Sequence, residues 1–333
     1  MAALDPERYE LVPVGIDRSG TWAIAHEATE LLARSGADAP ISLPTGGTAI
    51  EPQLALQSDA PSTTVVIPVL HGPNGEDGTI QGLLELADVA YVGAGVLGSA
   101  LAMDKSKAKE VLAANGVAQA RFRSAAEWEI DDDLLAEIAA DLGFPIFVKP
   151  ANMGSSVGVS KAVDAPGLAV AVAHALRFDE RLVFEETVVG REIEIGVLGN
   201  NQPRCSVPGE IVPGADFYDY DDKYVDGSAK LVIPADLSAD EIAALERLAL
   251  RAYSALRAEV LARVDVFYEE GGRGFLLNEI NTFPGFTPIS MFPRMWQATG
   301  LSYSALLDEM IRLALERHAR RRRVADAGRA PPT

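Results

Sequence analysis

Cysteine and histidine are scarce in this chain, and their scarcity excludes several kinds of site. The lone Cys205 cannot form an internal disulfide, which fits a protein of a reducing compartment. The four histidines, His26, His71, His174 and His318, are scattered along the chain, so we do not expect a zinc site. The chemistry is therefore sought among carboxylates, amides and basic side chains.

Long apolar runs and an excess of positive charge are also missing. No run approaches the roughly 18 apolar residues that would span a bilayer. The first residues, "MAALDPERYE", lack the apolar segment of a secretory signal, so we expect a cytoplasmic protein. The net charge of −19 disfavours binding to nucleic acid or to anionic membranes, because both require basic surfaces.

Lysine is rare as well. Only 7 of the 29 basic residues are lysines, so arginine is the default and each lysine is of interest. A lysine offers a compact, mobile ammonium, whereas an arginine offers a rigid fork. The lysines are Lys105, Lys107, Lys109, Lys149, Lys161, Lys223 and Lys230.

The pattern of apolar residues predicts an α/β protein of more than one domain, as 333 residues allow. Residues 1–104 alternate short strands with helical or loop segments and predict a parallel sheet. One helix is expected from near Ser99 to Gly116. Residues 105–190 and 191–317 form two further units of α+β character. The second of these includes a helix that a Ser238–Glu241 capping box opens. The basic tail, 318–333, is expected to fray in solvent, with a weak contact role as the alternative.

Residues 263–281, "RVDVFYEEGGRGFLLNEIN", predict a hairpin. A turn centred near Gly272 would place Asp265 opposite Glu279 and Arg263 opposite Asn281. Two carboxylates and an amide oxygen at one spot require a hard cation, and oxygen ligands suit Mg²⁺. The alternative is a pair that faces solvent, with an error in the register.

Residues 144–161, "FPIFVKPANMGSSVGVSK", place Lys149 in an apolar strand before a loop of small residues. Such a loop lets backbone N–H groups approach phosphate oxygens, although no Walker A motif is present. An ordinary glycine turn is the alternative.

Three other segments carry candidate residues. The loop "HGPNGEDGTIQG", which begins at His71, follows a strand and lies where α/β proteins bind ligands, or is only a capped loop. The segment "DFYDYDDKYVDG", 216–227, reads as a lid or as a disordered acidic loop. Glu185 and Glu192 suit an adenine amine and ribose hydroxyls, or are surface acids.

Together these segments resemble the D-alanine–D-alanine ligase family of the ATP-grasp superfamily. The 71–82 loop, "MDKSKAK", "VKPANMGSSVG", "FYDYDDKY" and "NEINTFPGF" occur in the family's order, from about residue 4 to 317. The resemblance implies an N-terminal α/β domain and a two-part ATP-grasp fold. The family's first strand and its glutamate are expected to be missing here.

The resemblance also implies residue roles. Lys105, Lys149, Ser155, Ser156, Glu185 and Glu192 would bind ATP. Asp265, Glu279 and Asn281 would hold two Mg²⁺ ions, with Mn²⁺ as a substitute and K⁺ as a further ion. Arg263, Gly285, Ser155 and Tyr224 would act in catalysis. His71, Tyr218, Lys223 and Ser290 would bind the amino acids.

The implied reaction is ATP-dependent ligation of two D-alanines through an acyl phosphate, by a homodimer. Two alternatives stay open at this point. One is a related ligase that takes D-lactate or D-serine as acceptor, and the other is a nucleotide-binding protein without ligase activity.

Overall fold

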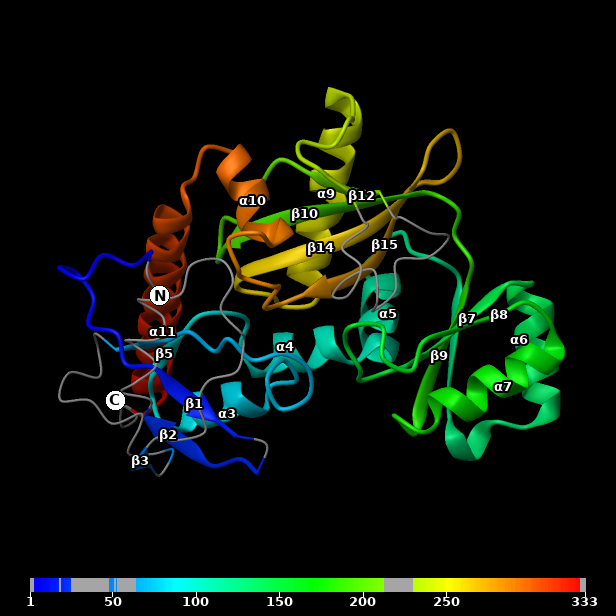
Figure 1. The fold of residues 1–333 in the computed structure, drawn as a ribbon, viewed down its shortest axis with the longest axis horizontal. Coiled ribbons are helices and arrows are strands. Elements are labelled where there is room, and N and C mark those ends of the chain that lie inside the picture. The colour runs from blue at the N-terminus through cyan, green and yellow to red at the C-terminus, as the bar shows by residue number, and fades with distance from the viewer. Residues whose placement is uncertain are drawn as a thin grey trace. The chain divides into compact units, whose positions relative to one another are not determined.

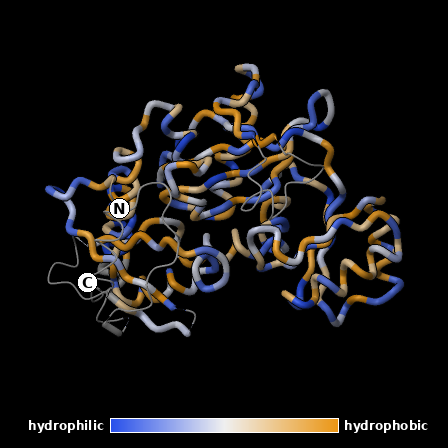
Figure 2. The backbone as a smooth tube through the Cα atoms, viewed as in Figure 1, coloured by the Kyte–Doolittle hydropathy of each residue, from blue (hydrophilic) through white to orange (hydrophobic). Residues whose placement is uncertain are grey.

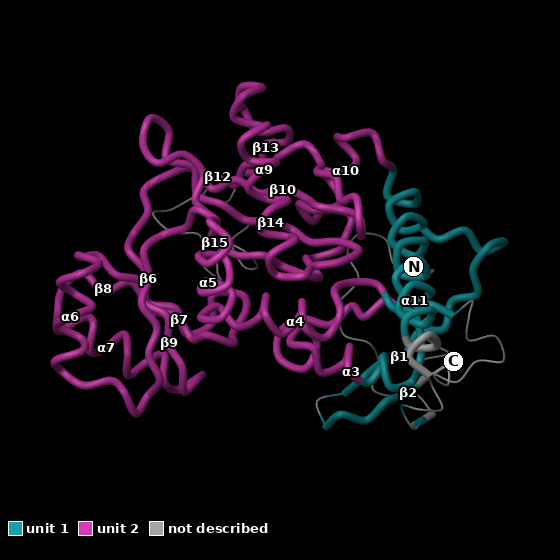
Figure 3. Tube along the Cα trace, turned by 180° about the vertical axis from the view of Figure 1, so that it is seen from behind, with its two compact units in different colours: residues 1–66, 83–91, 302–333 teal, residues 67–82, 92–301 magenta. Residues whose placement is uncertain are grey.

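The computed structural model describes residues 3–17, 19–24, 48–50, 52, 64–212 and 230–329. The chain divides into two compact units (Figure 3). The first combines 1–66, 83–91 and 302–333, and the second combines 67–82 and 92–301. The division into 1–104, 105–190 and 191–317 stays a prediction.

The described residues of the first unit form two small sheets. Antiparallel pairing joins β1 (Val14–Ile16), β2 (Trp22–Ile24) and β3 (Thr48–Ala49) in that order. Parallel pairing joins β4 (Val65–Val66) to β5 (Ala90–Tyr91). The parallel pair agrees with the predicted N-terminal sheet, whereas the antiparallel one was not predicted from the sequence.

The last helix of the first unit is longer than predicted. We expected a helix over 302–317 and a frayed tail, but α11 (Tyr303–Arg329) continues through the basic run. His318 lies 3.0 Å from Asp88, and Arg321 pairs with Glu85, so carboxylates of the same unit receive the tail's basic side chains. The expectation of a fraying tail from residue 318 was therefore wrong.

In the second unit, a four-stranded sheet carries two helices on one face (Figure 1). Its strands are ordered β6 (Phe122–Ala126), β9 (Arg181–Glu186), β7 (Ile146–Pro150) and β8 (Ser160–Ala162). A 3-10 turn over Glu127–Glu129 leads to α6 (Asp132–Leu142), and α7 (Ala165–Ala175) follows β8. Phe184, Ile138 and Leu168 pack in the core between sheet and helices. Since side chains alternate along a strand, the neighbours of Phe184 project from the opposite face.

A larger sheet follows in the same unit, in the order β13 (Lys230–Val232), β12 (Gly209–Val212), β10 (Arg191–Gly199), β14 (Val260–Glu269) and β15 (Gly274–Asn281), with β11 (Arg204–Cys205) beside β10. Helix α9 (Ala239–Ala255) covers one face, where Ile195, Val264 and Tyr253 are buried together. The predicted capping box opens this helix: the Ser238 N–H donates to Glu241 at 2.7 Å. Helix α10 (Met291–Ala298) contacts β10.

The helix predicted from Ser99 to Gly116 is broken in two. After α3 (Thr79–Leu86), the chain forms α4 (Val96–Met103) and α5 (Lys105–Ala114). Asp104 between them is extended, and its carboxylate accepts a hydrogen bond from the Lys107 N–H at 3.0 Å. An aspartate that caps a new helix ends the old one, so a single helix was the wrong prediction.

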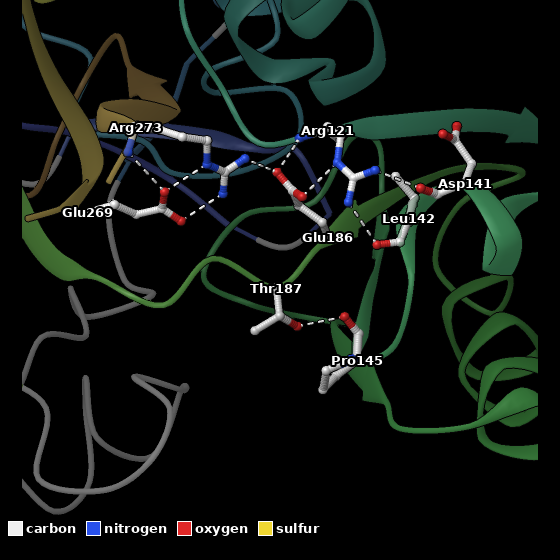
Figure 4. Close-up of polar contacts among 8 residues, drawn as sticks. All are labelled: Arg121, Asp141, Leu142, Pro145, Glu186, Thr187, Glu269 and Arg273. Carbon is white, nitrogen blue, oxygen red and sulfur yellow. Dashed lines mark hydrogen bonds and ion pairs between the residues drawn. The ribbon is translucent and has the colours of Figure 1, made fainter. Parts of the chain in front are cut away.

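Glu186, the last residue of β9, ties the two sheets of the second unit together (Figure 4). Its carboxylate accepts bonds from the Arg121 backbone N–H at 2.9 Å and from Arg121 Nε at 2.8 Å. Arg273, in the turn between β14 and β15, reaches the same carboxylate and also binds Glu269 at 2.7 Å. The segment between β9 and β10 also packs closely against β14, since a Cβ at Gly190 would lie 2.6 Å from the Tyr268 carbonyl oxygen.

Apolar and polar residues are interleaved along the described elements and form no long apolar segment (Figure 2). Accordingly, no helix in the part of the chain that the structure describes is both long and apolar enough to cross a membrane.

The Glu186 tie predicts a measurable loss of stability on substitution. Burial alone would raise the pKa of Glu186, but its bonds to Arg273 and Arg121 lower it below the ordinary value. Glu186→Gln should therefore reduce the free energy of unfolding at pH 7 by about 1–3 kcal/mol, measured by urea denaturation. A lowered pKa in the folded state adds stability that is fully present above the unfolded pKa and is lost as the pH falls through the folded pKa. The deficit of the variant should therefore shrink as the pH falls below about 4.3.

Glu316→Gln is the matched control, because Glu316 pairs with Arg312 on the exposed surface of α11. This change should stay within about 0.5 kcal/mol. Equal losses in the two variants would show that the Glu186 network contributes no more than a surface pair.

Candidate active site

The hairpin of β14 and β15 has the predicted register at its open end. Asp265 pairs with Glu279, and Arg263 pairs with Asn281, as the sequence predicts. A bulge between Asp265 and Val266 then shifts the pairing by one residue, so that Val266 faces Leu277. The bulge lies beside the two carboxylates, Asp265 and Glu279. Bulges are common next to functional sites, where they change the direction of a side chain.

A row of three acidic residues crosses the face of the sheet opposite α9. Glu194 on β10 pairs with Asp265 on β14, and Asp265 pairs with Glu279 on β15. Glu194 and Asp265 are buried, with exposed fractions of 6% and 9%. Like charges directly opposite one another destabilise a sheet, so this row requires positive charge nearby.

Arg263 supplies part of that charge. Its Nε and Nη2 donate to the two oxygens of Asp265 at 2.7 and 2.8 Å, and Nε lies 3.1 Å from Glu194. Burial acts to lower the pKa of Arg263, but the Asp265, Glu194 and Glu279 carboxylates outweigh it and hold the pKa well above the usual range. The guanidinium is thus a fixed cation of the site.

Asn281 completes a set of oxygen-bearing side chains. Its Nδ2 donates to Asp265 at 2.9 Å and lies 3.5 Å from Glu279. An amide that contacts two carboxylates through its nitrogen can present its oxygen instead after a flip of the side chain. No three His, Cys, Asp or Glu side chains form a metal cluster within the described residues. One or two carboxylates suffice for Mg²⁺, so Asp265, Glu279 and Asn281 fit this ion.

The predicted phosphate loop joins β7 to β8. Ser155 and Ser156 have positive φ values of 52° and 60°, which few residues other than glycine adopt. Lys105 holds the start of the loop, since its ammonium donates to the Met153 carbonyl and its N–H donates to the Ala151 carbonyl at 3.0 Å. Ser155 is exposed, so the loop presents its hydroxyl to the surroundings.

Lys105 is half-buried, and the charges of Glu279 on the hairpin and Glu185 on β9 both act on it. Burial lowers the pKa of its ammonium, while Glu279 and Glu185 act to raise it.

Glu185 at the end of β9 is 3% exposed and is contacted by two lysines. Lys149 Nζ lies 2.9 Å from one carboxylate oxygen, and Lys109 Nζ lies 3.3 Å from the other. Burial would raise the pKa of Glu185, but Lys109 and Lys149 outweigh it and lower the pKa to about 2. Glu185 is therefore ionised at every physiological pH and is no surface acid.

Glu192 lies on β10, two residues before Glu194, and thus projects from the same face of the sheet. Its strand neighbours are Phe267 and Ile211. It is half-buried.

The loop that begins at His71 is organised by its own acids. The Gly72 N–H donates to Glu76 at 2.6 Å, and the Thr79 N–H donates to Asp77 at 2.9 Å. Burial raises the pKa of Glu76, and the nearby Glu279 charge adds to the rise. His71 itself is exposed.

Gly285 and Ser290 lie close together after the hairpin. A Cβ at Gly285 would lie 3.3 Å from the Ser290 hydroxyl oxygen. Ser290 is the N-cap residue of α10, and its hydroxyl lies 2.8 Å from that of Thr287. Tyr218, Lys223 and Tyr224, predicted for the lid, lie outside the described residues.

Three residues of this region were missed in the sequence. Lys109 follows Lys105 by one helical turn, which would have placed both on one face of a helix. Glu194 follows Glu192 by two positions in a strand, a spacing that puts both on one face. Glu76 stands within a segment already singled out, but its spacing gave no indication of burial.

A separate cavity of about 420 Å³ is lined by Glu241, Tyr268 and Arg273 among others. Tyr268 belongs to the core on the α9 side of the sheet, so this cavity is not part of the site described above.

Comparisons with known proteins agree on one family. The family model described as D-ala D-ala ligase C-terminus matches residues 111–312, and that described as D-ala D-ala ligase N-terminus matches residues 1–94. A D-alanine–D-alanine ligase of Bacillus cytotoxicus is 45% identical, over 97% of this chain and 91% of its own. One of Geobacillus thermodenitrificans is 46% identical, over 96% of this chain and 90% of its own.

Solved structures give the same result. The D-alanine–D-alanine ligase of Coxiella burnetii superimposes with a TM-score of 0.81 at 32% identity, over 98% of this chain and 91% of its own. VanG, a D-Ala:D-Ser ligase of Enterococcus faecalis, superimposes with a TM-score of 0.77 at 32% identity, over 94% of this chain and 92% of its own. With both family models matched and relatives this similar along nearly its whole length, the chain belongs to the D-alanine–D-alanine ligase family, and its fold is that of the ATP-grasp enzymes.

Proposed function

We propose that this protein joins two D-alanines to D-alanyl-D-alanine, with cleavage of ATP to ADP and phosphate, for peptidoglycan precursor synthesis. The observation that carries the proposal is the convergence of Asp265, Glu279 and Asn281 on one hairpin, with Arg263 beside them. D-alanine is favoured as acceptor over D-serine and D-lactate, because the curated relatives named above are D-alanine–D-alanine ligases.

The first step activates a carboxylate. An alanine carboxylate is a poor acyl donor because oxide is a bad leaving group, and transfer of the γ-phosphoryl group converts it to an acyl phosphate. Two Mg²⁺ ions, or Mn²⁺ in their place, would be held by Asp265, Glu279 and Asn281. When bound, such ions offset the charge of the phosphates. We add K⁺ only as a further ion that the family resemblance suggests.

The basic residues of the second unit would hold the nucleotide. Lys105 and Lys149 neutralise phosphate oxygens, and the backbone around Ser155 and Ser156 covers them. Glu185, kept ionised by its lysines, accepts a bond from the adenine amine. Glu192 on the adjoining strand meets the ribose hydroxyls.

The second step forms the peptide bond. The amine of the second D-alanine attacks the acyl carbon, and the carbonyl oxygen takes up negative charge. The bond from this carbon to the phosphate oxygen then breaks, phosphate leaves, and the nitrogen loses a proton. Arg263 and the Gly285 N–H would stabilise that oxyanion. Arg263 suits the role because Glu194 and Asp265 fix its guanidinium before the charge develops.

The remaining roles concern the amino acids and water. We assign His71, Ser290, Tyr218 and Lys223 to substrate binding. Tyr224 would close over the site with Ser155, because water must be excluded or the acyl phosphate hydrolyses. A cytoplasmic location and a homodimer complete the proposal.

The activity itself is the first test. The purified protein with Mg²⁺ and ATP should release ADP and phosphate only when D-alanine is added, and the product should be D-alanyl-D-alanine. Mixed acceptors, D-alanine with D-serine or D-lactate, should yield the D-alanine product in excess. Nucleotide turnover that ignores D-alanine would refute the proposed reaction.

Asp265→Asn tests the metal site. The variant loses a charge that a divalent ion would meet, so binding of Mn²⁺ in the presence of ADP should weaken by at least about tenfold, since a charged contact is worth about 1.5–3 kcal/mol. Electron paramagnetic resonance of Mn²⁺ measures this binding directly. Asp141→Asn is the control, because Asp141 pairs with Arg123 at the surface, and this variant should bind Mn²⁺ normally. Unchanged binding in Asp265→Asn would place the ions elsewhere.

Arg263→Lys tests the oxyanion role. Lysine keeps the positive charge but loses the fork that binds both Asp265 oxygens, so kcat should fall by about 10²–10³. Affinity for ADP, measured by calorimetry, should change little, because the nucleotide is held by other residues. A loss confined to nucleotide affinity would instead assign Arg263 to ATP binding.

A further inference from the structure

Lys109 is a buried lysine that contacts neither substrate nor metal ion in the proposed mechanism. It lies on α5 with 3% of its surface exposed. Its Nζ lies 3.3 Å from Glu185 Oε1 and 5.4 Å from the centre of the Phe122 ring. The ion pair with Glu185 is the polar contact that holds this ammonium.

The cluster around Glu185 carries one more positive charge than its single carboxylate needs. Lys149 already contacts Oε2 at 2.9 Å, and Lys109 contacts the opposite oxygen. Burial of a second ammonium is costly, and burial indeed lowers the pKa of Lys109 despite the opposing Glu185 charge. One lysine would suffice to neutralise the carboxylate, so the second fixes it in place by holding both oxygens.

Lys105 and Lys109 occupy one face of α5, one helical turn apart. The Lys105 ammonium reaches the Met153 carbonyl at the phosphate loop, whereas the Lys109 ammonium reaches Glu185. In the proposed site, this one short helix therefore supports both the phosphate end and the base end of the nucleotide.

In the proposed site, Glu185 contacts the purine at position 6, where adenine and hypoxanthine differ. An adenine carries an amine there, which donates a hydrogen bond, whereas hypoxanthine carries an oxygen, which only accepts. An ionised carboxylate held at both oxygens can accept but cannot donate, so it favours the amine and repels the oxygen.

We propose that Lys109 is a positioning residue that sets the selectivity of this protein for 6-aminopurine over 6-oxopurine nucleotides, by holding Glu185 as a fixed, ionised acceptor. The inference rests on the proposed binding of ATP at Glu185. It assigns to Lys109 no contact with the nucleotide.

The test compares ADP with IDP, by calorimetric binding and by the kcat/KM of ATP and ITP. Lys109→Met removes the ammonium and keeps an unbranched side chain. Affinity for ADP should fall by about tenfold or more, and the preference for ADP over IDP should shrink by a similar factor, since a charge-assisted contact is at stake. Lys109→Arg, which keeps the charge, should retain more of the preference than Lys109→Met.

Lys107→Met is the matched control on the same helix. Lys107 is about half exposed and pairs with Glu110 at 2.8 Å, so it should leave both affinities unchanged. A purely structural role for Lys109 predicts equal losses for ADP and IDP with no change in preference, and that result would overturn the inference.

Glu185→Gln separates the inference from the proposed function. An amide can donate to the oxygen of hypoxanthine, so this variant should gain preference for IDP. If Lys109 acts through Glu185, then Lys109→Met added to Glu185→Gln should change the preference no further. No effect of Glu185→Gln would defeat the proposed base contact, whereas an effect of Glu185→Gln without one of Lys109→Met would defeat only the inference.

Discussion

The repulsion within the row of Glu194, Asp265 and Glu279 is the constraint on which the site depends. Pairing on adjacent strands fixes these carboxylates side by side, and the apolar α9 face leaves them no alternative direction. Arg263 relieves part of the repulsion by binding Asp265 with both nitrogens of its fork while it also contacts Glu194. In the proposed function the rest is relieved by divalent ions, which would draw Asp265 toward themselves. Glu194 then remains as the partner that keeps Arg263 in place.

The four-stranded sheet carries the opposite imbalance. Lys109 and Lys149 contact the single carboxylate of Glu185, so this part of the second unit has positive charge in excess. A polyanion with bound divalent cations matches both imbalances, because its phosphates suit the lysines and its cations suit the acidic row. Mg²⁺ with ATP is such a ligand. The two clusters therefore support one proposed ligand through opposite signs of charge.

The sequence predicted these features to the extent that they are local. Alternating apolar residues and a glycine-rich turn were enough to predict the pairing of Asp265 with Glu279, because a turn fixes the register of the strands that it joins. The break at Asp104 and the bulge after Asp265 escaped prediction, since each depends on one side chain or one extra residue. Lys109 and Glu194 escaped because their partners lie far away in the chain. The helical tail depends likewise on Glu85 and Asp88, some 230 residues distant in sequence.

The end of β9 connects Glu185 and its lysines with the hairpin of β14 and β15. Consecutive residues of a strand point to opposite faces, so Glu185 meets the lysines while Glu186 meets Arg121 and Arg273. A displacement of this strand end would thus disturb the proposed base contact and the tie to the hairpin at once. Because the turn that carries Arg273 belongs to the same hairpin as Asp265 and Glu279, the ion pair between Arg273 and Glu186 restrains the strands of the proposed metal ligands relative to the proposed base contact at Glu185. In the proposed function Glu186 contacts neither the nucleotide nor the metal ions. Its ion pairs nevertheless limit how far the proposed base contact and the proposed metal ligands can move apart.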